Sequence, residues 1–92
     1  MKVLVEAGRL AEAGTTFALA TVVAVERPSS ARVGDRALVT ADGELHGWVG
    51  GACTEPEVIR LSLGALADGE PRCERIESRC ASEGAVEVLI EP

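Results

Sequence analysis

The stretch Thr16-Phe17-Ala18-Leu19-Ala20-Thr21-Val22-Val23-Ala24-Val25 decides the fold of this chain. It is rich in β-branched and aliphatic residues, which favour a strand. Its polar residues alternate too little for a strand with one face in water, as expected of a strand buried inside a sheet. We therefore predict a central strand from Thr15 to Glu26.

A helix is predicted on each side of this strand in the sequence. Residues 2–12 carry apolar side chains at helical spacing, and Gly14 is a suitable stop. Further on, Thr54-Glu55-Pro56-Glu57 fits a capping box, in which a threonine at the helix start is followed by a glutamate three residues later. The second helix is predicted to run to about Asp68, with Gly69 and Pro71 ending it.

Shorter strands complete the pattern. Asp42-Gly43 is a two-residue hairpin signal between predicted strands at 36–40 and 44–49, and further strands are predicted at 72–77 and 86–90. Residues 27–35 combine turn formers with arginines and predict a loop. The sum is an α+β fold, a single domain over residues 1–92 with a mostly antiparallel or mixed sheet and two helices packed on it.

Composition limits the classes of function. The chain has 92 residues and a net charge of −6, which disfavours a nucleic-acid partner bound through its phosphates. The apolar run at the N-terminus is broken by Glu6 and Arg9, so no signal peptide or membrane span is predicted, and we expect a cytoplasmic protein. A core this small also leads us to expect a homo-oligomer.

The three cysteines are Cys53, Cys73 and Cys80. Their odd number and irregular spacing predict no structural disulfide, with Cys73 in the core and Cys80 in a turn. Zinc binding by the three cysteines and His46 is compatible with composition, but no spacing supports it, so no metal site is predicted.

The glycine-rich turn from Gly47 to Cys53 is the candidate functional site. Helix starts favour anions and lower the pKa of nearby thiols, so Cys53 is predicted to be a reactive thiol or ligand, with Gly50 and Gly51 letting a bound group approach the backbone. The alternative is that Cys53 is a small buried apolar residue. Glu55 is left open as an acid–base group, whereas the capping box already explains Glu57.

Three arginines lie in or beside the predicted loop, at positions 27, 32 and 36. Guanidinium groups grip phosphate through paired N–H donors, so these arginines are candidates for an anion pocket. Solvated loop charge is the alternative for each of them.

With those residues in view, the chain resembles the XdhC/CoxI family of accessory proteins for molybdenum hydroxylases such as xanthine dehydrogenase and carbon monoxide dehydrogenase. The resemblance spans nearly the whole chain. It rests on five stretches in their order and spacing: Ala18–Val23, Ser29–Gly34, Leu38–Gly43, Gly50–Glu55 and Cys80–Pro92. Ala52 stands where the family usually has glycine, and Glu83 where a second glycine is usual.

The resemblance implies a carrier or chaperone, not a catalyst with turnover, that binds molybdenum cofactor transiently and delivers it to an apo-hydroxylase. A cysteine desulfurase is a second implied partner. By the same resemblance, Cys53 would be a thiol at the cofactor, and Gly50, Gly51 and Arg32 would hold its phosphate or pterin. Glu55 and Cys80 complete the candidate set.

Two other functions remain open. One is a non-catalytic interaction module that oligomerises, or that pairs with a separate Rossmann-type domain of the kind many relatives carry after this one. The other is an enzyme with Cys53 as nucleophile and Glu55 nearby, for which the sequence identifies no base partner.

Overall fold

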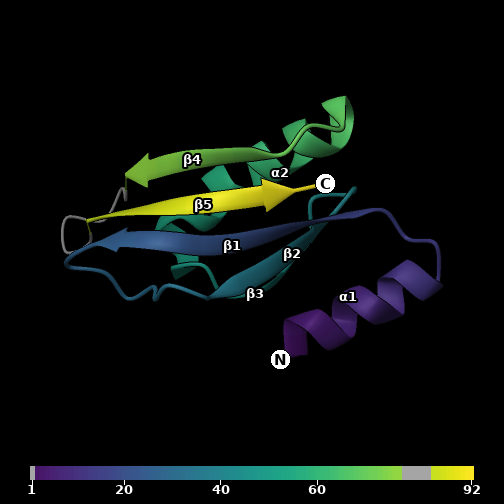
Figure 1. Ribbon diagram of the computed structural model, residues 1–92, viewed down its shortest axis with the longest axis horizontal. Coiled ribbons are helices and arrows are strands. Elements are labelled where there is room, and N and C mark those ends of the chain that lie inside the picture. The colour runs from purple at the N-terminus through teal and green to yellow at the C-terminus, as the bar shows by residue number, and fades with distance from the viewer. Residues whose placement is uncertain (1, 78–83) are drawn as a thin grey trace.

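The computed structural model describes residues 2–77 and 84–92. It confirms an α+β fold in which the sheet is antiparallel throughout (Figure 1). The elements are α1 (Lys2–Glu12), β1 (Phe17–Glu26), β2 (Arg36–Thr40), β3 (Leu45–Gly47), the 3-10 turn η1 (Gly51–Cys53), α2 (Glu55–Asp68), β4 (Arg72–Glu77) and β5 (Ala85–Glu91).

Strand β1 lies in the middle of the sheet, as predicted. The strand order is β3-β2-β1-β5-β4, so β1 pairs with β2 on one side and with β5 on the other. The pairing with β5 shifts by one residue after Val22, and Val23 is the extra residue of a β-bulge. The edges of the sheet are the short β3 and the charged β4.

Helix α2 covers the inner face of the sheet, behind it in Figure 1. Alternate residues of β1 and β5 point to this face because side chains alternate along a strand. Val22, Val88 and Ile90 are fully buried there, as are Val58 and Ala65 from the helix. This layer holds most of the apolar core.

Helix α1 contacts the other face over β1, β2 and β3. Leu38 is fully buried although it points away from the inner face, which its neighbours Ala37 and Val39 occupy. Its cross-strand neighbours are Leu19 and His46. No described residue of α1 is itself buried, so this second layer is thin.

The predicted ends of the helices are confirmed. Gly69 adopts a left-handed conformation after α2, with φ of 74°, and its N–H donates to the carbonyl of Ala65 at 2.8 Å. The hairpin between β2 and β3 is also confirmed, but its turn is one residue longer than predicted. Thr40 N–H bonds to the carbonyl of Glu44 at 2.9 Å, which leaves residues 41–43 in the loop.

Candidate functional site

The glycine-rich turn connects β3 to α2 at one end of the sheet. Gly50 has a φ of 117° and Gly51 a φ of 73°, values that side chains disfavour. A Cβ on Gly50 would lie 2.7 Å from Thr54 Oγ1, and one on Gly51 would lie 2.9 Å from the Trp48 ring. The space at both glycines is therefore filled by atoms of this chain.

The capping box predicted for α2 is wrong. Thr54 makes no side-chain cap, because its buried hydroxyl donates to the carbonyl of Val49 at 2.9 Å. Glu57 instead pairs with Arg60 one turn further along the helix. Thr54 therefore closes the glycine-rich turn on itself, and the first turn of the helix relies on Pro56 and on its acidic residues.

Segments distant in sequence meet at this turn. Ala31 of the 27–35 loop lies 3.6 Å from the Cβ position of Gly50, and Gly84 N–H donates to the carbonyl of Pro28. Ser29, Gly50, Thr54 and Gly84 line one narrow cleft. The fold thus brings the Arg32 loop beside Gly50, Gly51 and Cys53, and α2 begins there with the half-buried Glu55. Cys80, the remaining candidate, lies outside the described residues.

The cysteines differ from the sequence prediction. Cys53 is half-buried and disulfide-bonded, so the prediction of no structural disulfide is wrong. Cys73 is a free thiol and is exposed, so its predicted place in the core is also wrong. The reason is that β4 is an edge strand and Cys73 points away from α2, to the face that this helix does not cover.

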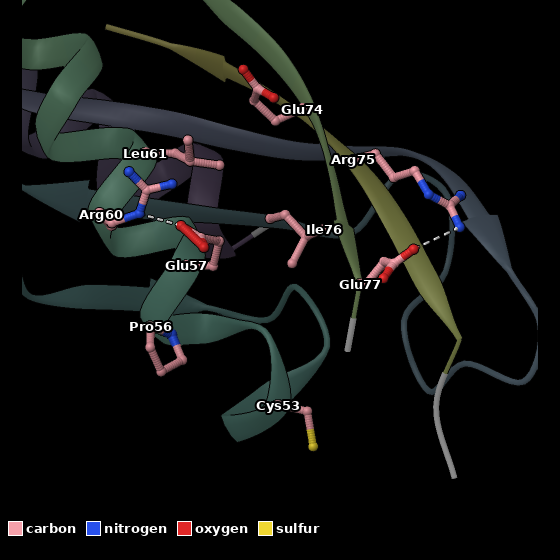
Figure 2. Close-up of a pocket in the computed structure, with 9 residues that line it drawn as sticks. All are labelled: Cys53, Pro56, Glu57, Arg60, Leu61, Glu74, Arg75, Ile76 and Glu77. Atoms are coloured by element: carbon pink, nitrogen blue, oxygen red, sulfur yellow. Dashed lines mark hydrogen bonds and ion pairs between the residues drawn. The ribbon is translucent and has the colours of Figure 1, made fainter. Parts of the chain in front are cut away.

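A cavity of about 150 Å³ lies beside Cys53, between α2 and β4. Figure 2 shows Leu61 of the helix and Ile76 of the strand pointing toward one another across it, with Cys53 and Pro56 at one end. None of the residues that α2 and β4 contribute to this cavity is among the candidate site residues predicted from the sequence. They come together only because β4 lies at the edge next to the helix, and no local motif carries that information.

The charged side chains of this cavity are mostly paired. Arg60 pairs with Glu57, and Arg75 pairs with Glu77 at 3.7 Å and with Glu26 (Figure 2 draws the first two pairs). The hydrogen bond to Glu26 raises the pKa of the Arg75 guanidinium. Glu74 has no ion-pair partner within the described ranges, so the cavity has a surplus negative charge.

The three arginines at positions 27, 32 and 36 lie outside the cavity beside Cys53 and line two other hollows. Arg27 and Arg32 line a second, open hollow of about 600 Å³ on the 27–33 segment. Arg36 lines a separate hollow of about 360 Å³ with Trp48 and the start of α1. The structure therefore groups two of the three arginines and separates the third.

The other predictions concern metal and membrane. Among residues 2–77 and 84–92 there is no group of three or more side chains that could hold a metal ion. On the hairpin, His46 Nε2 lies 3.2 Å from Glu44 Oε1. Within the same ranges, no helix is long and apolar enough to cross a membrane.

Comparison with known proteins identifies this α+β domain, with its glycine–cysteine turn, as a family member. The chain belongs to the XdhC and CoxI family, which it matches over residues 10–77. It is 39% identical over 85 residues to the uncharacterized protein YqeB of Escherichia coli (strain K12). That match covers 92% of this chain but 15% of YqeB, so the chain spans a small part of its relative.

The same fold occurs in the crystal structure of a protein named a xanthine dehydrogenase, from Bacillus halodurans. The TM-score is 0.79 and the sequence identity is 24%, with 92% of this chain and 28% of that chain covered. At this level of identity the likeness concerns the fold.

Proposed function

We propose that this domain is an accessory factor for the maturation of a molybdenum hydroxylase, and that it contacts the molybdenum cofactor through the Cys53 turn. Membership of the XdhC and CoxI family supports the role. The single observation that carries the proposal is the convergence of the 27–35 loop, the Gly50–Cys53 turn and Gly84 at one end of the sheet.

The size of the cavity beside Cys53 limits how the cofactor is held. Complete small-molecule sites usually measure about 300–1,000 Å³, whereas this cavity measures about 150 Å³. The side-chain space at Gly50 and Gly51 is also already filled. The domain therefore fits one part of the cofactor, and the hydroxylase or another chain provides the rest of the enclosure.

The proposed contacts follow from residue chemistry. Arg32 holds a phosphate oxygen through its guanidinium, while Gly50 and Gly51 shape the turn and Glu55 accepts a hydrogen bond at the start of α2. Cys53 and Cys80 are the thiol candidates of the set. Once in the hydroxylase, the cofactor supplies the metal centre of that enzyme.

The thiol role requires reduction, because Cys53 is disulfide-bonded. A dithiol reductant such as dithiothreitol gives two electrons and two protons to the disulfide, releases two cysteine thiols and becomes a cyclic disulfide. In the cell a thioredoxin-type dithiol would be the corresponding reductant. The reduced form is therefore the one expected to bind.

The test is anaerobic incubation with purified molybdenum cofactor, followed by gel filtration and measurement of molybdenum. We expect retention by the wild type with dithiothreitol, loss in Cys53→Ala, and retention in Cys73→Ala, which removes the exposed free cysteine as a matched control. Equal retention by Cys53→Ala would remove the thiol from the proposal. No retention by the reduced wild type would refute cofactor binding.

A second candidate function is a non-catalytic interaction module, which the exposed apolar residues favour. Val5 is 70% exposed, Trp48 46% and Leu4 42%, and the last two line the same hollow. Sedimentation equilibrium at micromolar concentrations tests self-association. A concentration-dependent dimer that dissociates in Leu4→Ser supports this function, and a monomer at every concentration contradicts the homo-oligomer.

A further inference from the structure

The seven arginines that the structure describes in this acidic chain fall into two groups. Arg9, Arg60, Arg72 and Arg75 all pair with carboxylates, through Glu6, Glu57, Asp68, and Glu26 with Glu77 respectively. Arg27, Arg32 and Arg36 make no ion pair within the described ranges, although acidic residues outnumber basic ones 15 to 9 in the sequence. Among the described residues, the unpaired guanidinium groups thus all lie within the ten-residue segment 27–36.

The nearest carboxylates in sequence are already used by other groups. Glu26, next to Arg27, pairs with Arg75 on β4. Asp35 accepts a hydrogen bond at 2.9 Å from the backbone N–H of Arg32, not from its guanidinium. With respect to residues 2–77 and 84–92, the guanidinium groups of Arg27 and Arg32 therefore keep their donors for another partner.

The loop that carries Arg27 and Arg32 is held in place by hydrogen bonds. Gly34 N–H donates to the carbonyl of Val22, and Val22 N–H donates to the carbonyl of Asp35, both at 2.8 Å. At the other side of the loop, Ala31 is buried and its N–H donates to Ser29 Oγ at 3.1 Å. A fixed backbone lowers the entropy cost of binding a ligand between the two side chains.

We infer that Arg27 and Arg32 form a two-armed phosphate subsite in the hollow they share. Val25, Pro28 and Val33 give this hollow an apolar wall, and Ser29, whose Oγ accepts the hydrogen bond from Ala31 N–H, also lines it. Paired guanidinium groups beside an apolar wall suit a phosphate monoester attached to an apolar or planar body. The inference deepens the proposed function and rests on it for the identity of the complete ligand.

Isothermal titration with inorganic pyrophosphate at constant ionic strength tests the subsite without the cofactor. We expect Arg27→Gln and Arg32→Gln each to weaken binding at least tenfold. Arg36→Gln is the matched control, because it removes the same charge from an exposed, unpaired arginine in the other hollow. We expect it to change the affinity less than twofold. All three arginines are exposed, so the fold should tolerate each change, and unchanged melting temperatures check this.

Two results would overturn the subsite. One is equal weakening by Arg36→Gln, which would indicate a diffuse charge effect, and the other is no wild-type binding at millimolar pyrophosphate. The molybdenum retention assay separates this inference from the proposed function. Pyrophosphate binding that depends on Arg27 and Arg32, in a protein that retains no molybdenum, would keep the subsite and refute the cofactor role. Retention of molybdenum without such dependence would refute the subsite alone.

Discussion

The two ends of the sheet use glycine in different ways. At the end with Cys53, a Cβ on Gly47 would lie 2.5 Å from the carbonyl oxygen of Arg36, and a Cβ on Gly50, Gly51 or Gly84 would also lie less than 3.0 Å from another atom. At the opposite end, Gly14 and Gly69 have no atom within 4 Å of a Cβ. At these two positions glycine serves only the backbone conformation of a turn.

The difference shows where segments of the chain pack so closely that a side chain cannot be accommodated between them. A turn glycine in open space can be replaced at the cost of backbone strain alone, whereas a crowded glycine holds two segments at a distance that no side chain permits. Such close approach is expected where several loops must present side chains in fixed positions. It occurs at the end that carries the candidate site.

Gly84→Ala should have the largest effect. Its Cβ would overlap the carbonyl oxygen of Glu26, and this contact is to backbone, which cannot rotate away. We expect a loss of about 3 kcal/mol or more in the free energy of unfolding, measured by urea denaturation. Gly8→Ala in α1 is the control, since nothing lies within 4 Å of its Cβ, and it should stabilise the protein by about 0.5–1 kcal/mol. Equal free energies of unfolding for the two variants would contradict the difference between crowded glycines and glycines in open space.

Gly51→Ala should have an intermediate effect. The new Cβ meets the Trp48 ring at 2.9 Å in a left-handed backbone conformation, but the Trp48 residue is 46% exposed, so its ring can shift. We expect a loss of about 2 kcal/mol in the same measurement. Ala52→Ser next to it is exposed and should stay within about 0.5 kcal/mol of the wild type.

Gly69→Ala, at the opposite end, should cost less. Only the left-handed conformation at the end of α2 is affected, so about 1 kcal/mol is expected from the same denaturation curves. A larger loss in the free energy of unfolding for Gly69→Ala than for Gly84→Ala would contradict the expected difference between the two ends of the sheet.

The smallest effect is expected from the charge of Asp68, also at this end. A hydrogen bond from Glu70 N–H, and then the Arg72 guanidinium, lower the pKa of its carboxyl group. A lowered pKa in the folded state stabilises the protein above the ordinary pKa of about 3.9, and this contribution disappears as the pH falls through the folded value. Asp68→Asn should therefore be slightly less stable than the wild type at neutral pH. The difference should vanish in acid, and a constant difference from pH 7 to pH 2 would contradict the charge effect.

The elements with strong local signals were predictable from the sequence. The Thr16–Val25 run fixed β1 as the central strand, and Gly14 and Gly69 marked the ends of the helices, because these signals are local. The capping box failed because the Thr54 hydroxyl has a competing acceptor in the carbonyl of Val49. That acceptor is brought into reach by the glycine-rich turn, whose path the sequence pattern did not specify.

The candidate site was predictable only in part. Cys53, Gly50 and Arg32 were chosen from the sequence, and their closeness depends on Ala31 packing against the turn. The disulfide at Cys53 and the exposure of Cys73 depend on strand order and on spatial distance, neither of which is encoded in the number or spacing of cysteines. The division of the three loop arginines between two hollows has the same origin.

Trp48 lies over Gly51, two residues before Cys53, and the sequence contains no other tryptophan and no tyrosine. The near-ultraviolet emission of the protein therefore comes almost entirely from one indole at the candidate site. Opening of the disulfide or arrival of a ligand at the turn would change the surroundings of that indole. The wild-type chain thus carries a built-in optical reporter, which can follow both events in real time without a label.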